Sequence, residues 1–77
     1  MKLTYNPTHN IGYIRFREKT TGVETIRVSD ELNIDIAPDG SVYGIELLNA
    51  NGQLRSEPFK YLVIENAETG KSTTVAF

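Results

Sequence analysis

The chain has 77 residues, no cysteine, one histidine and a formal net charge of −2. A core of this size seldom stabilises a fold by more than about 3–5 kcal/mol unless a disulfide, a metal or a partner contributes. The absence of cysteine excludes disulfides and thiolate metal sites, and one histidine does not supply the several ligands of a zinc site. Residues 1–77 are therefore expected to form one domain that is stabilised by packing or by association.

The charge balance gives no electrostatic attraction toward nucleic acid or anionic lipid, because both signs are scattered along the chain. The longest apolar run, Tyr61-Leu62-Val63-Ile64, is far shorter than the roughly 20 residues that cross a bilayer. The first residues lack the apolar segment of a signal peptide. These features predict a cytoplasmic protein with no membrane association.

Apolar and polar residues alternate with a period of two, and no segment carries a helical stripe. This pattern predicts an all-β fold of about six to seven short antiparallel strands, arranged as a meander of hairpins in a small sandwich or a partly open barrel. Turn residues recur at Asn6-Pro7, Thr21-Gly22, Pro38-Asp39-Gly40, Asn51-Gly52 and Thr69-Gly70.

The first predicted hairpin joins residues 12–18 to residues 23–28 through a loop that ends at Gly22. Its register pairs Phe16 with Ile26 and gathers the apolar side chains on one face. The opposite face would then carry Tyr13, Arg15, Arg17, Thr25 and Arg27.

The second predicted hairpin turns at Ala37-Pro38-Asp39-Gly40, a type I turn sequence. A four-residue loop would pair Ile34 with Tyr43 and Leu32 with Ile45. The other face would then carry Asn33, Asp35, Val42, Gly44 and Glu46.

The third predicted hairpin joins residues 60–65 to residues 72–77, and two registers fit it. One register pairs Val63 with Val75, whereas a loop longer by one residue pairs Leu62 with Val75. Residues 49–59, which precede this hairpin, are expected to form a loop or an edge strand because they contain a proline.

Both sides of the third hairpin carry large apolar side chains, and its last strand has no charge to protect an exposed edge. We therefore expect a homodimer in which two chains join these edges or stack these faces around a two-fold axis. An intramolecular sandwich, with the hairpin folded over the first two, is the alternative. The candidate interface residues are Tyr61, Val63, Val75 and Phe77.

The first hairpin offers a second candidate surface, a polar contact face that combines arginines with an aromatic ring. Such a face can bind phosphates and stack bases, but the acidic balance of the chain argues against a nucleic-acid partner. Its residues are Tyr13, Arg15, Arg17 and Arg27.

Groups able to transfer protons are few. His9, in a loop without a cysteine nucleophile or an acid partner, is expected to be exposed to solvent. Asp35 and Glu46, with Glu31 nearby, are expected to form a solvated acidic face. Gly44, inside a strand, marks either a bulge or the close approach of another group. No catalytic residue, metal ligand or cofactor site is predicted, and the chain is not expected to be an enzyme.

The order of these segments resembles the small bacterial family called domain of unknown function 2283. The resemblance rests on Tyr5-Asn6-Pro7, Tyr13-Ile14-Arg15-Phe16, Ser29-Asp30-Glu31, Asn33-Ile34-Asp35-Ile36 and the stretch from Asp39-Gly40 to Asn49-Ala50. It covers about residues 3–50 and implies a compact antiparallel sheet. The chain has Asn6 and Asn10 where the family tends to show aspartate, so no role of those carboxylates carries over.

The resemblance implies no established activity, although some members resemble the smaller partner of toxin–antitoxin pairs. Together with the residues above, it favours a non-catalytic binding or regulatory module that acts through protein–protein contacts and could be antitoxin-like. The alternatives are a purely structural homo-oligomer and a nucleic-acid-binding module that uses Arg15, Arg17 and Arg27.

Overall fold

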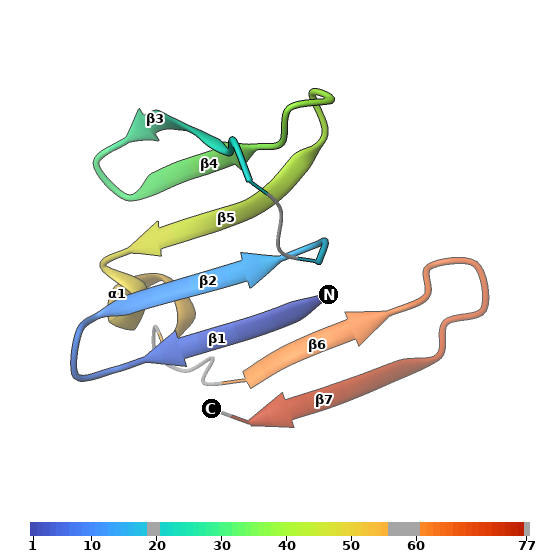
Figure 1. Cartoon of the computed structure of the whole chain (residues 1–77). Coiled ribbons are helices and arrows are strands. Elements are labelled where there is room, and N and C mark those ends of the chain that lie inside the picture. Colours follow the sequence, from blue (N-terminus) through green and yellow to red (C-terminus); the bar gives the residue numbers. More distant parts are fainter. Residues whose placement is uncertain (19–20, 56–60, 77) are drawn as a thin grey trace.

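The computed structural model describes residues 1–18, 21–55 and 61–76 (Figure 1). All strand pairings in this part of the chain are antiparallel, which confirms the predicted all-β fold. The elements are β1 (Lys2–Asn6), β2 (Ile11–Arg15), β3 (Glu24–Ser29), β4 (Leu32–Ile36), β5 (Val42–Leu48), α1 (Ala50–Leu54), β6 (Tyr61–Glu65) and β7 (Ser72–Ala76).

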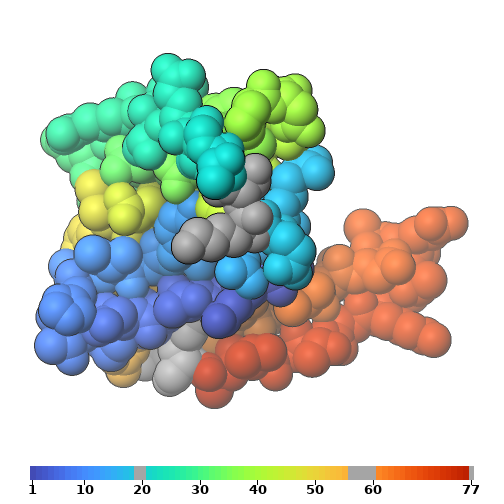
Figure 2. All heavy atoms as spheres, viewed as in Figure 1, coloured from blue at the N-terminus to red at the C-terminus, as the bar shows by residue number. Residues whose placement is uncertain are grey.

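The strands form a five-stranded sheet in the order β1-β2-β5-β4-β3 and a two-stranded sheet of β6 and β7. Strands β1 and β3 are the edges of the larger sheet (Figure 1). The hairpin β6–β7 meets the larger sheet only on its β1 side and extends beyond it (Figure 2). The molecule is accordingly a flat plate with principal extents of 37, 33 and 19 Å.

The first predicted hairpin is wrong, because β2 and β3 do not pair. Strand β2 lies between β1 and β5, where Ile14 is opposite both Leu3 and Ile45. Strand β3 pairs with β4, its neighbour in the chain, and places Ile26 opposite Ile34. This arrangement lines up branched apolar side chains in one continuous row across five strands. Strand β1 was not predicted.

The second predicted hairpin is right in its turn and wrong in its register. The Gly40 N–H donates to the Ala37 carbonyl at 2.9 Å, and the Ala37 N–H donates to Ser41 at 2.8 Å. Gly40 adopts a φ of 87°, the left-handed region that favours glycine, so the loop has three residues instead of four. Further along, Ile34 lies opposite Ile45 instead of Tyr43.

An irregularity in β5 accounts for the remainder of this difference. Asp35 lies opposite Gly44 but Ile36 lies opposite Val42, so Tyr43 is an extra residue in the ladder. Beyond the bulge, the observed register differs from the predicted one by two residues. Because side chains alternate between faces with a period of two, they remain on their predicted faces there. Val42 is the exception: it was expected on the polar side, and it instead lines a hollow with apolar side chains.

The third hairpin adopts the predicted register that has the longer loop. Leu62 lies opposite Val75, and Val63 lies opposite Thr74. Tyr61 lies opposite Ala76, whereas its predicted partner Phe77 is outside the described residues.

The helix α1 occupies part of the stretch that was expected to be a loop or an edge strand. It begins beside the β1–β2 loop, where Asn10 Oδ1 accepts a hydrogen bond from the Asn51 N–H at 2.7 Å and the Asn10 carbonyl accepts one from the Ala50 N–H at 3.1 Å. Ala50 is fully buried. A Cβ on Gly12 would lie 3.1 Å from Leu54, so the helix packs closely on β2.

Candidate functional site

The five-stranded sheet has one face that is almost entirely apolar. Cross-strand partners share a face, so the pairings place one row of branched side chains across all five strands. Flanking residues of the same alternation extend this row. We call this surface the apolar face; it comprises Leu3, Ile14, Ile45, Ile34, Ile26, Phe16, Leu47 and Leu32.

The apolar face is incompletely covered. Among the described residues, the buried hydrophobic ones are Ala37 and Ala50, and no large side chain is fully buried. Phe16 is 41% exposed and Ile26 is 48% exposed. Because a sheet normally buries its apolar face against a second layer, this surface is a candidate interface.

Two hollows lie along the face. The first, of about 520 Å³, is lined by Phe16, Arg17, Val42 and Ile45. The second, of about 350 Å³, lies where the hairpin meets β1, β2 and α1. Its lining residues are Met1, Leu3, Ile14, Leu54, Leu62 and Ile64. The hairpin thus covers only the β1 side of the apolar face.

The predicted interface residues of the hairpin divide between its two sides. Leu62 faces the second hollow, and Val75 lies opposite it on the same side. Tyr61 and Val63 alternate with Leu62 and therefore face away from the five-stranded sheet. Val63 and Val75 are 47% and 48% exposed, so both sides are open to solvent.

The polar face of the sheet holds a hydrogen-bonded cluster centred on Asp35. One carboxylate oxygen accepts the Tyr13 hydroxyl at 2.6 Å, and the other accepts the Thr25 hydroxyl at 2.6 Å. The Tyr13 ring crosses Gly44, where a Cβ would lie 2.6 Å from Tyr13 Cζ. Both predicted readings of Gly44 therefore apply, since Tyr13 approaches it closely and the bulge at Tyr43 adjoins it.

Burial, followed by the hydrogen bond to the Asp35 carboxylate, raises the pKa of Tyr13 above its ordinary value of about 10. Folding therefore favours the protonated phenol, and the stabilisation that it contributes is complete below about pH 10 and lost as the pH rises toward the folded-state pKa. We expect the difference in unfolding free energy between the wild type and Tyr13→Phe to be constant at neutral pH and to shrink above about pH 10. Urea unfolding at stepped pH measures this difference, and a constant difference at alkaline pH would contradict it.

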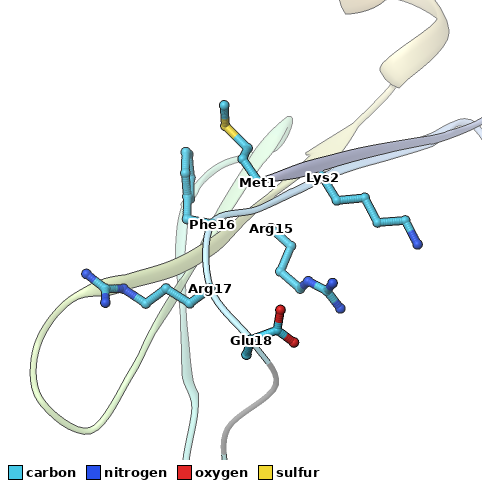
Figure 3. Close-up of a pocket in the computed structure, with 6 residues that line it drawn as sticks. All are labelled: Met1, Lys2, Arg15, Phe16, Arg17 and Glu18. Atoms are coloured by element: carbon cyan, nitrogen blue, oxygen red, sulfur yellow. The ribbon is translucent and has the colours of Figure 1, made fainter.

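The arginines of the predicted polar contact face do not form one cluster. Arg15 and Arg27 lie on the polar face, but β5 and β4 separate their strands. Arg27 pairs with Asp30 at 2.6 Å. Arg17 follows the end of β2, where Figure 3 shows Arg15 and Lys2 on one side of the chain and Phe16 on the other.

The candidate proton-transfer groups are also dispersed. His9 is exposed in the β1–β2 loop. Glu46 accepts a hydrogen bond from Asn33 at 2.9 Å, and Glu31 accepts one from Asn49 at 3.2 Å. Within residues 1–18, 21–55 and 61–76, no three acidic or histidine side chains gather as metal ligands would.

These features define a small antiparallel β protein with one incompletely covered apolar sheet face. The model of the family described as "Protein of unknown function (DUF2283)" matches residues 2–51, and the chain belongs to this family. The match spans the five-stranded sheet and ends at the start of α1, before the hairpin β6–β7. No curated protein and no solved structure matches the chain.

Asn6 and Asn10, where the resemblance implied aspartate, have structural roles. Asn6 Oδ1 accepts the His9 N–H at 3.1 Å in the β1–β2 loop. Asn10 Oδ1 accepts the Asn51 N–H at the start of α1. An aspartate oxygen accepts such bonds equally well, so these positions are explained by the turn and the helix start.

In the described part of the chain, no helix is long enough to span a bilayer, because α1 has only five residues.

Proposed function

We propose that this protein is a non-catalytic binding module whose interface is the apolar face. The single observation that carries the proposal is the exposure of Phe16 and Ile26 at the ends of a continuous apolar surface. Exposed contiguous apolar patches mark interaction sites in soluble proteins. Burying such a surface against a partner would supply stability that a core of this size lacks.

The polar groups support the same reading. Asp35 and Glu46 are engaged by neighbouring side chains of the sheet, and His9 stands apart from both in the β1–β2 loop. A general acid–base mechanism needs such groups within reach of one another and of a substrate. The side chains of the polar face thus serve to hold the strands together, which leaves the apolar face as the surface for binding.

The absence of cysteine from the chain provides a direct test, because a single introduced cysteine reports on one position. Ile26→Cys places a thiol on the apolar face, and Arg27→Cys places the matched control on the polar face of the same strand. In cells of the native host, a permeant maleimide should label Ile26→Cys several times more slowly than Arg27→Cys. In purified protein diluted to low concentration, the two rates should be similar.

Equal labelling of both cysteines inside the cell would show that the apolar face is uncovered there, and the proposed interface would be wrong.

A further inference from the structure

The hairpin β6–β7 is apolar on both sides, although its own chain can cover only one. Leu62 and Ile64 line the hollow against β1 and β2 but remain 37% and 58% exposed, while Tyr61 and Val63 alternate with them and face away from the sheet. A continuous apolar run is typical of a strand that is buried on both faces. The run at residues 61–64 therefore fits a middle layer, and the single chain covers only one of its sides, in part.

The exposed area of the chain indicates how much surface the missing layer should bury. The accessible surface is 5736 Å², whereas a compact monomer of this mass exposes about 4,700 Å². The excess of roughly 1,000 Å² is close to the roughly 800 Å² that each partner contributes to a standard interface. The radius of gyration, 14.0 Å, likewise exceeds the roughly 11.5 Å of a compact domain of this length.

The same chain presents both halves of a complementary contact. One half is the outward side of the hairpin, with Val63, and the other is the open part of the apolar face, with Phe16 and Ile26. In a two-fold dimer, a surface on one copy contacts a second surface on its partner, and the reverse contact forms by symmetry. A single two-fold association would therefore cover both exposed surfaces on each of the two copies.

We propose that a second copy of this chain covers the apolar face, with each hairpin lying between its own sheet and the sheet of its partner. This inference rests on the proposed function and names its partner. The hairpin contributes Tyr61 and Val63 to the partner's sheet, and the receiving surface includes Phe16, Ile26 and Ile45. Residues 61–64 are then covered on both faces, as is typical of a continuous apolar strand.

The mass of the purified protein tests association. Light scattering should give twice the chain mass of 8.6 kDa at micromolar concentration. Val63→Lys should raise the dissociation constant of the dimer by about tenfold or more, because it buries an unpaired ammonium group in the interface. Thr25→Lys, which adds the same charge on the polar face, should leave the dimer intact.

Cross-linking tests the arrangement without a destabilising charge. Chains carrying Val63→Cys are mixed either with chains carrying Ile26→Cys or with chains carrying Arg27→Cys, and a short bis-maleimide is added. The yield of cross-linked dimer should be far higher in the mixture with Ile26→Cys. A single-chain mass up to high micromolar concentration would overturn the second copy, as would equal cross-linking to both positions. If the Ile26→Cys thiol were still protected in cells, a different protein would be the partner and the proposed function would stand.

Discussion

Gly44→Ala should destabilise the fold by about 1–2 kcal/mol, although the same change in an ordinary strand is neutral or favourable. The new Cβ would lie 2.6 Å from Cζ of Tyr13, so the ring must leave its position over β5. Moving the ring breaks the hydrogen bond between the Tyr13 hydroxyl and Asp35. A hydrogen bond to a charged group contributes about 1.5–3 kcal/mol, which exceeds the gain from removing a glycine.

A double-mutant cycle separates this clash from other effects of the new methyl group. In a Tyr13→Ala background, Gly44→Ala has no ring to displace and should be neutral or stabilising. Urea unfolding of the four proteins measures the coupling between the two positions. If Gly44→Ala has the same cost in both backgrounds, Tyr13 is not the reason for the glycine.

Ile45→Ala should cost about 2 kcal/mol, and Ile34→Ala should cost a similar amount within the range of about 2–4 kcal/mol. Ile45 lies at the centre of the apolar row, directly between Ile14 and Ile34. Truncation removes contacts with both neighbouring strands and leaves a cavity between them. Because Ile45 is only half-buried in the single chain, the lower end of the range is expected.

Arg17→Ala is the matched surface change and should alter stability by no more than about 0.5 kcal/mol. Its side chain is exposed, and it lies two residues beyond Arg15, the last residue of β2. Denaturant unfolding ranks the three variants. If Arg17→Ala were the most destabilised, the assignment of the two faces of the sheet would be inverted.

The faces of the strands could be predicted from the sequence because alternation is a local property. The register of the second hairpin was displaced by two residues, an even number, so Ile34 and Ile45 still share a face. The all-β fold and the two-sided apolar hairpin followed from the same alternation. The position of Val42 could not be predicted, since it depends on one extra residue in the ladder.

The order of the strands could not be predicted, because it depends on which of several similar apolar strands become neighbours. The alternation of apolar residues allows Ile14 to lie opposite either Ile26 or Ile45. Only the assembled sheet shows that Ile45 is the partner. The cluster of Tyr13 with Asp35 was missed for the same reason, since it requires β5 to lie between β2 and β4. Gly44 was the one signal of that cluster, and by itself it did not identify the approaching group.

The position of β5 between β2 and β4 also bears on how the chain reaches this structure. The β1–β2 hairpin and the β3–β4–β5 meander each form from contacts between neighbouring segments, whereas their union pairs Ile11 with Leu48 and Arg15 with Gly44. Closing such a long loop has an entropic cost before the new pairs form, and non-local pairings of this kind slow folding. We therefore expect the two local units to form first and the β2–β5 seam that joins them to form in the rate-limiting step, so that substitutions at this seam slow folding in stopped-flow measurements.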